Sequence, residues 1–227
     1  MEKRSTPRTS APEPLRLVHV DDHCLVVDKP AGLLCVPGRG DDKQDCLAAR
    51  VQERYPDALT VHRLDMATSG LWLMARGAEM QRRLSRAFAE RQVAKRYLAV
   101  VAGRLAPAAA AVDGWSEIDL PLAADWPNRP RSRVDTARGK PSLTRWRVLV
   151  DGGATATTRL ELAPVTGRSH QLRVHLQALG HPILGDALYA PDAVAWASPR
   201  LLLHATTLSL AHPCSAAALA FHSDPPF

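Results

Sequence analysis

The sequence predicts an α+β domain built around a largely antiparallel sheet. Short runs of strand-forming residues outnumber the stretches with helical periodicity, and several of these runs are joined by tight turns, as in hairpins. No internal repeat and no recognisable linker divides the chain, so residues 15–227 are expected to form one domain.

The elements of the first half follow from apolar patterning. Residues 15–28 alternate, turn and return, which predicts a hairpin. Asp45 is a candidate N-cap for a helix that runs to Tyr55 and stops at the following proline. Residues 71–75 (LWLMA) form a continuous apolar run, which is typical of a buried strand.

The second half contains the clearest helix and several strands. Met80, Leu84 and Phe88 recur four residues apart, so one apolar stripe marks a helix over 78–91. A second helix is expected over 169–180, with Gly180 as its C-terminal cap. Strands are predicted at 97–101, 144–150, 155–162 and 201–204, with a turn at 151–153 and a loop of small residues over 104–111.

Composition sets broad limits on the class of protein. The 227 residues carry a formal charge of +6, which favours polyanionic partners without identifying one. The four cysteines contain no C-x-x-C pair and are expected to be free thiols. Residues 1–14 are polar and read as a disordered tail rather than a secretory signal. No apolar run approaches the ~20 residues that span a bilayer, so we expect a cytoplasmic protein.

Two segments stand out chemically, namely residues 61–70 (VHRLDMATSG) and 166–175 (TGRSHQLRVH). The first places one carboxylate, Asp65, directly after a histidine, an arginine and a leucine. Such a carboxylate can act as a nucleophile or as a general base, provided that it stays charged while water is excluded. An arginine partner favours the charged form and holds its orientation. On its own, an aspartate in a turn is more often a cap or a solvated side chain.

Together, in this order, the two segments resemble the signature motifs of the RluA-type pseudouridine synthases, and the resemblance extends from about residue 15 to the C-terminus. It implies a pseudouridine synthase fold: α+β, with a largely antiparallel mixed sheet, flanking helices and a central RNA-binding cleft. It also implies isomerisation of uridine in RNA, in which the N1–C1′ bond breaks and uracil reattaches through C5. Nothing is oxidised or added in that reaction, so neither a cofactor nor a metal is expected.

The resemblance assigns roles to matching positions. It makes Asp65 the catalytic carboxylate, which either attacks C1′ or removes the proton from C2′. It makes Tyr97, which follows Lys95-Arg96, the group that stacks on the detached uracil. Arg168, near the predicted start of the second helix, is expected to be the arginine that pairs with Asp65.

Binding of RNA is expected to involve two further sets of residues. A paired uridine must be flipped out of its stack, and Arg63 is placed to fill the vacated space, while His62 positions the loop or contacts phosphate. An open basic stretch provides Arg129, Arg131 and Arg133 for backbone contacts that weaken with salt. The preceding DWPNRP segment looks like the short, dual-specificity RluA branch, which implies a 23S ribosomal RNA hairpin and tRNA anticodon stem-loops as partners.

Other interpretations remain open at this stage. The substrate could be restricted to tRNA, or the chain could be a non-catalytic RNA-binding module, although such a module has no need of the predicted catalytic trio. His170 and His175 are five residues apart and would diverge on a helix, so no metal site is expected there. His175 is interpreted as a packed or hydrogen-bonded residue. A monomer without an S4-type domain is expected, and residues 104–116 match no motif.

Overall fold

The computed structural model describes residues 14–40, 43–107, 111–151 and 156–227. The large sheet contains β1 (Leu17–Val20), β2 (Cys24–Lys29), β3 (Ala58–Thr60), β4 (Ser69–Arg76), β5 (Ala94–Ala102), β6 (Ser116–Asp119), β9 (Leu143–Asp151), β10 (Thr157–Pro164), β11 (Leu203–Ala211) and β12 (Ala218–His222). A separate ribbon contains β7 (Leu122–Ala124) and β8 (Ser132–Val134). The helices are α1 (Leu47–Gln52), α2 (Gly77–Ala89), α3 (Gln171–Ala178), α4 (Asp192–Ala195) and the 3₁₀ helix η2 (Trp126–Asn128).

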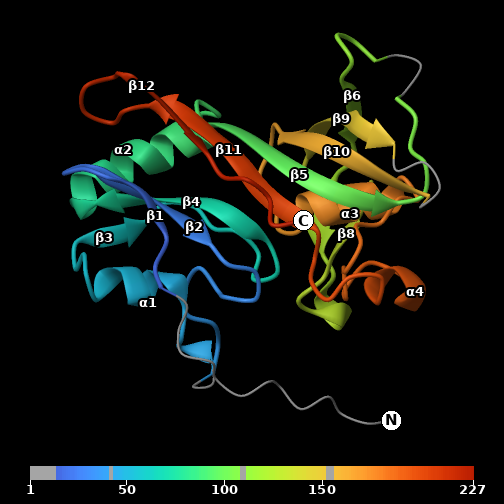
Figure 1. The fold of residues 1–227 in the computed structure, drawn as a ribbon, viewed down its shortest axis with the longest axis horizontal. Helices are drawn as coiled ribbons and strands as arrows, with labels where there is room; N and C mark the ends of the chain where they lie inside the picture. The colour runs from blue at the N-terminus through green and yellow to red at the C-terminus, as the bar shows by residue number, and fades with distance from the viewer. Residues whose placement is uncertain (1–13, 41–42, 108–110, 152–155) are drawn as a thin grey trace.

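The ten-stranded sheet runs through the whole molecule (Figure 1). Its order is β1-β2-β4-β11-β5-β10-β9-β6, with β3 added to β4 and β12 added to β11. Among the described strands every pair is antiparallel except β4 with β11. This mixed, largely antiparallel sheet confirms the predicted α+β class.

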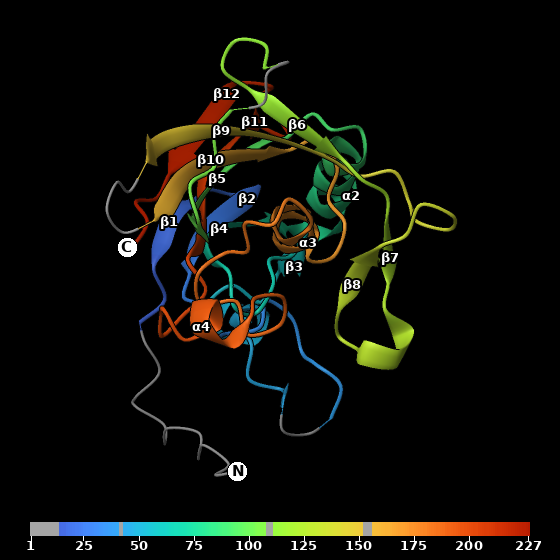
Figure 2. The same ribbon diagram turned by 90° about the vertical axis from the view of Figure 1, so that its right-hand side faces the viewer.

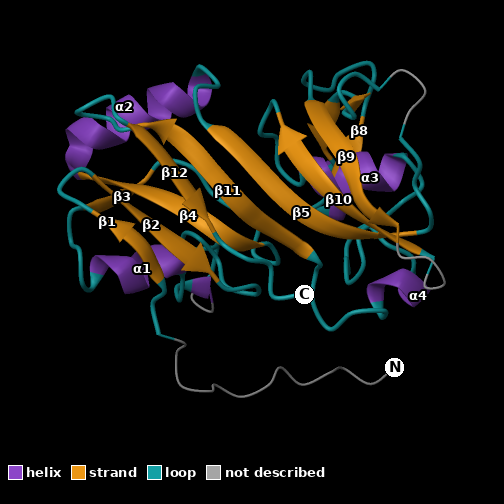
Figure 3. Cartoon of the chain, turned by 45° about the horizontal axis from the view of Figure 1, so that its top comes forward, coloured by secondary structure: helices purple, strands orange, loops and turns teal. Residues whose placement is uncertain are grey.

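Strand β4 shows how the core is divided between the two faces of the sheet. Successive side chains of a strand point to opposite faces. Trp72 and Met74 pack in the cluster that includes α1, whereas Leu71 and Leu73 pack in the cluster that includes Leu84 of α2. Helices α1 and α2 therefore cover opposite faces of this part of the sheet, as Figure 3 shows. The continuous apolar run of the sequence is thus a strand buried on both faces.

Helix boundaries differ from the prediction at α1 and α3. The N-cap of α1 is Cys46, whose sulfur accepts the Ala49 amide, while Asp45 turns outward to form an ion pair with Arg50. Helix α3 begins at Gln171 rather than at 169, because His170 adopts a left-handed conformation. Gly180 has a φ of +82° just beyond the helix, as expected for a C-terminal cap.

Several short elements escaped prediction. Strands β3, β7 and β8 have three residues each, and β6, β12 and α4 are only slightly longer. Residues 1–13, most of the expected disordered tail, and residues 152–155, most of the 151–153 turn, lie outside the described residues, as do residues 108–110 of the expected loop. No helix in the described part of the chain is long and apolar enough to cross a membrane.

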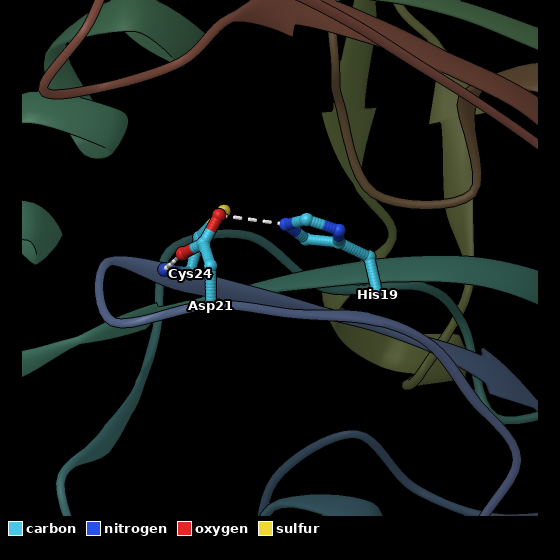
Figure 4. A group of neighbouring side chains, drawn as sticks. All are labelled: His19, Asp21 and Cys24. Atoms are coloured by element: carbon cyan, nitrogen blue, oxygen red, sulfur yellow. Dashed lines mark hydrogen bonds and ion pairs between the residues drawn. The ribbon is translucent and has the colours of Figure 1, made fainter.

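A hydrogen-bonded group around Asp21 joins the β1–β2 turn to the β11–β12 turn. His19 Nε2 lies 2.7 Å from Asp21 Oδ2, as Figure 4 shows, and His212 Nε2 lies 3.3 Å from the same oxygen. Asp21 Oδ1 accepts the amides of His23 and Cys24. The potential metal-ligand atoms of His19, Asp21 and Cys24 lie within 4.8 Å of one another. Burial, however, raises the pKa of the Cys24 thiol to about 12, so the thiol stays neutral. The cluster is therefore explained by hydrogen bonds that hold the two turns together.

The β7–β8 ribbon projects away from the large sheet and is tipped by η2 (Figure 2). Its β8 strand lies beside α3, and Leu122 of β7 packs with Val174 of α3 and Tyr189. The ribbon therefore borders the helix that carries the second signature segment.

The parallel contact of β4 with β11 requires a glycine. Gly70 pairs with Ala205 and has a φ of +109°, and a Cβ there would overlap the Ala205 carbonyl oxygen and lie 2.6 Å from its nitrogen. Gly32 also has a positive φ, of +87°, but a Cβ there meets nothing within 4 Å.

We predict that Gly70→Ala lowers the free energy of unfolding far more than Gly32→Ala does. Both variants carry backbone strain on the order of 1 kcal/mol, but only Gly70→Ala forces two central strands apart, which adds at least about 2 kcal/mol. Urea denaturation followed by circular dichroism measures both. Equal losses in the two variants would show that close approach of β4 and β11 is unimportant.

Candidate active site

A cleft of about 720 Å³ opens between the 61–68 loop, strand β5 and the start of α3. Its lining contains, among the described residues, seven arginine or lysine side chains and a single carboxylate, that of Asp65. The cations are Arg63, Arg91, Lys95, Arg96, Arg145, Arg168 and Arg173. A cleft lined by one sign of charge raises the local concentration of oppositely charged ligands. Such a cleft suits a polyanionic ligand whose charges contact the cations while one of its neutral groups lies against the Asp65 carboxylate.

Asp65 lies in a tight turn that precedes β4. The Thr68 amide donates to the Asp65 carbonyl at 3.1 Å, and the Leu64 amide donates to the buried sulfur of Cys35. The Asp65 side chain keeps about a quarter of its surface exposed, so the carboxylate is held by the turn yet remains open to the cleft.

The buried lysine Lys29 holds this turn in place by hydrogen bonds. Lys29 is 1% exposed, and its Nζ donates to the carbonyls of Pro30, Leu33 and Met66 at 2.7–3.0 Å. Burial lowers the pKa of Lys29 to about 8. Three carbonyl acceptors match the three protons of an ammonium group, whereas the neutral amine has only two. The bonded form is therefore the charged one, and it ties the residue after Asp65 to the segment that follows β2.

The arginine that pairs with Asp65 is Arg173. Its Nη1 lies 3.5 Å from Asp65 Oδ2, while its Nε and Nη2 bind the two oxygens of Asp186 at 2.8 and 2.6 Å. The side chains of Arg173 and Asp186 are 4% and 1% exposed. Asp186 thus fixes the plane of the guanidinium by a bidentate contact, and the remaining nitrogen faces Asp65.

This arrangement corrects the expectation that Arg168 clamps Asp65. Arg168 lines the cleft, but it is exposed and makes no ion pair with Asp65 among the described residues; its guanidinium lies 3.4 Å from the Pro141 carbonyl. The physical reason is its position, since residue 168 precedes α3 in a turn, whereas residue 173 lies on the buried face of the helix. The available signal was an arginine three residues before Leu176, a residue of the predicted inner face of this helix.

Tyr97 lies on β5 at the centre of the sheet, opposite Ala205 of β11 and Leu162 of β10. Its half-buried ring lines the same cleft as Asp65. Burial, reinforced by the Asp65 charge, raises the pKa of the phenol, so its hydroxyl keeps its proton at neutral pH. The structure therefore places all three residues expected to be catalytic in the lining of one cleft, although Arg168 is not the partner of Asp65.

The histidine and arginine before Asp65 have different surroundings. His62 stacks on Phe88 with ring centroids 4.4 Å apart, and its Nε2 accepts the Leu73 amide. Burial, together with the Lys95 charge, lowers the pKa of His62 to about 3, so the ring is neutral, and its contacts support the loop. Arg63 is exposed and lines the cleft.

The three arginines expected to bind RNA lie on the β7–β8 ribbon or at its tip, apart from the cleft lining. Arg129 covers the exposed ring of Trp126 at 3.2 Å from its centroid. Arg131 lies over the ring of Tyr189, and Arg133 forms an ion pair with Asp135. The stretch is thus a structured ribbon rather than the open segment that its prolines suggested.

Sequence reasoning assigned no role at the cleft to His170, whose Nε2 lies 3.8 Å from Asp65 Oδ1. The five-residue spacing of His170 and His175 does not indicate this contact, which joins two segments far apart in the sequence. His175 is fully buried between the Thr144 hydroxyl and the Leu120 carbonyl, which confirms its interpretation as a hydrogen-bonded core residue.

Comparison with known proteins agrees with this geometry. A family model described as RNA pseudouridylate synthase matches residues 23–178. The chain is 49% identical over 214 residues to the dual-specificity RNA pseudouridine synthase RluA of Escherichia coli K12, with 94% of each chain covered. It is 47% identical over 213 residues to the protein of that name from Pasteurella multocida, again with 94% of each covered.

Solved structures give the same result. The human RNA pseudouridylate synthase domain containing 1 superposes with a TM-score of 0.74 at 29% identity, covering 97% of this chain and 87% of that one. The human domain containing 4 has a TM-score of 0.69 at 24% identity and supports the fold alone. With the cleft, the paired carboxylate and these likenesses in agreement, the chain belongs to the RluA-type RNA pseudouridine synthases.

Proposed function

We propose that this enzyme, which isomerises uridine to pseudouridine in RNA, acts on hairpin loops of both ribosomal and transfer RNA, with Asp65 as its catalytic carboxylate. The observation that supports the proposal best is a lone carboxylate, paired with a fixed guanidinium, in a cleft lined with cations. The dual-specificity name of the relatives supports the two classes of substrate.

The roles of the cleft residues follow from their chemistry. Arg173 holds Asp65 in orientation after RNA displaces water, so that a carboxylate oxygen meets the ribose of a flipped uridine. Asp65 then attacks C1′ or removes the C2′ proton, and the N1–C1′ bond breaks. Tyr97 stacks on the freed uracil while C5 turns toward C1′, and Arg63 occupies the space that the uridine left. In the first route C5 displaces the Asp65 carboxylate from C1′, and in the second route the proton returns from Asp65 to C2′ as the C5–C1′ bond forms. C5 then loses its proton and N1 gains one, so the product has the composition of the substrate.

Contacts outside the cleft determine which RNA is held. Arg129, Arg131 and Arg133 lie on the β7–β8 ribbon, where they can contact the phosphates of a stem while its loop enters the cleft. These contacts make affinity fall as salt rises. The enzyme works as a monomer in the cytoplasm, where both classes of RNA are found.

Asp65→Asn is expected to abolish pseudouridine formation and to keep RNA affinity, because the amide cannot act as nucleophile or base. Carbodiimide labelling with primer extension measures the product, and a filter-binding assay measures affinity. Asp45→Asn, which alters an exposed acid outside the cleft, serves as the control. Substantial turnover by the Asp65 variant would remove this carboxylate from the mechanism.

Arg173→Lys is expected to reduce the single-turnover rate roughly a hundredfold, the effect of losing one preorganised donor. Lysine keeps the charge beside Asp186 but cannot contact both carboxylates with a rigid fork. Arg168→Ala removes a cleft cation that has no ion pair with Asp65 in the described structure, so its loss should appear mainly as weaker RNA binding. If Arg168→Ala slowed the bound complex as much as Arg173→Lys, the assignment of the partner would be reversed.

Deletion of the gene is expected to remove pseudouridine from one ribosomal hairpin and from the anticodon stem-loops of several tRNAs. Mapping pseudouridines in total RNA from cells with and without the protein tests this directly. Re-expression of the wild type should restore both sets, and the Asp65→Asn protein should restore neither. Loss confined to tRNA would establish the narrower substrate range instead.

A further inference from the structure

The hydroxyl of Tyr189 connects the ribbon to the cleft. Tyr189 is 4% exposed and lies on the segment between α3 and α4. Its oxygen accepts the amide of Ser132, a residue of β8, at 2.7 Å and lies 2.6 Å from Nδ1 of His170. His170 in turn lies 3.8 Å from Asp65 through its Nε2. One buried side chain thus contacts both the proposed RNA-binding ribbon and the neighbour of the catalytic carboxylate.

The hydrogen bonds of Tyr189 favour one tautomer of His170. The Tyr189 oxygen already accepts the Ser132 amide, so its own proton is available for Nδ1 of His170. Burial raises the pKa of Tyr189, which keeps that proton on the phenol. Burial also lowers the pKa of His170, so the ring is neutral near pH 7. A neutral ring that accepts at Nδ1 carries its hydrogen on Nε2, the nitrogen nearer to Asp65.

The backbone of His170 is strained in order to reach this position. Its φ of +56° lies in the left-handed region, which is unfavourable for a residue with a side chain. His170 precedes the first residue of α3, but its side chain caps no amide there and instead lies against Tyr189, ring edge to ring face. Strain of this kind is typical of positions where function requires the side chain.

The ring of Tyr189 makes a second connection. The Arg131 guanidinium of the ribbon lies 5.3 Å from the ring centroid, and the Arg173 guanidinium lies 4.9 Å from it. Arg173 is the partner of Asp65. The hydroxyl and the ring therefore reach Asp65 by separate routes, one through His170 and one through Arg173.

We infer that Tyr189 and His170 are positioning residues which transmit the seating of RNA on the β7–β8 ribbon to the orientation of the Asp65 carboxylate. Phosphates held by the ribbon arginines keep Ser132 in place, Ser132 orients the Tyr189 hydroxyl, and His170 then presents its Nε2 hydrogen toward Asp65. The inference rests on the proposed function, because it requires RNA on the ribbon and catalysis at Asp65.

The charges that face His170 are few and come from three segments. Asp65 and Arg63 belong to the 61–68 loop, Arg173 belongs to α3, and Asp186 follows that helix. The two acids favour a charged imidazole, whereas the two arginines and burial oppose it. Loss of the Tyr189 hydroxyl removes a donor that only the neutral ring can accept, so it shifts this balance toward protonation.

Tyr189→Phe tests the inference because it removes one oxygen and keeps the ring over both arginines. We expect the single-turnover rate on an anticodon stem-loop RNA to fall about ten- to a hundredfold, the usual effect of removing the partner that orients a functional histidine. The dissociation constant for that RNA should stay within about twofold of the wild type, since no group on the RNA-facing surface changes. Tyr55→Phe, at a tyrosine outside the cleft, is the matched control and should leave both values unchanged.

The pH dependence separates positioning from a general structural defect. In Tyr189→Phe the neutral His170 can carry its hydrogen on Nδ1 and turn a lone pair toward Asp65. Protonation restores the Nε2 hydrogen, and because burial lowers the pKa of His170 below its usual value of 6.5, the rate deficit relative to wild type should shrink as the pH falls below 6.5. Equal rates for variant and wild type, or a deficit that is constant with pH and accompanied by weaker RNA binding, would overturn the inference.

A measurement without RNA distinguishes this inference from the proposed function. In ¹⁵N-histidine-labelled protein the wild-type His170 should show the neutral Nε2–H tautomer, and Tyr189→Phe should lose it. An inactive wild type would refute the proposed function, while the tautomer would still decide whether the link exists. A tautomer that is unchanged in the variant would overturn the link even in an active enzyme.

Discussion

The candidate active site depends on one guanidinium shared by two carboxylates. Asp186 is almost completely buried and would be costly there without a cation, so it holds Arg173 by both oxygens. Two of the three guanidinium nitrogens are thereby committed, and the third is left for Asp65. To make this contact, the fold must bring together α3, the segment that follows α3 in the sequence and the turn before β4. The large sheet can be viewed as the frame that keeps these three parts in register.

Much of the frame could be predicted from local patterns, and the exceptions have physical reasons. The β1–β2 hairpin and α2 are long enough for their periodicity to be visible in the sequence, and β4 is visible as a continuous apolar run. Three-residue strands such as β7 and β8 exist because a partner strand supplies their hydrogen bonds, and no short pattern encodes that partner. The start of α1 moved by one residue because a sulfur, rather than the neighbouring carboxylate, caps the helix.

The site was only partly accessible to the same reasoning. Asp65 and Tyr97 belong to recognisable segments, and the structure brings both to one cleft. Arg168 and Arg173 occupy the same segment, and only the start of α3 decides which of them faces the carboxylate. His62 has a basic neighbour and a polar ring, but its stacking on Phe88 and the amide that it accepts make it a neutral support. In each of these cases the role of the residue depends on contacts between elements that are far apart in the sequence.

The position of β11 in the sheet determines when the sheet can be completed during synthesis of the chain. This strand comes late in the chain, yet it lies between β4 and β5, in the middle of the ten strands. The segment with Asp65 leads into β4, and Tyr97 lies on β5. During synthesis these two strands are joined in the sheet only when residues 203–211, which form β11, leave the ribosome and pair with both. Such distant pairing is slow to form. The sheet therefore joins the segments that carry Asp65 and Tyr97 only after β11 has been synthesised.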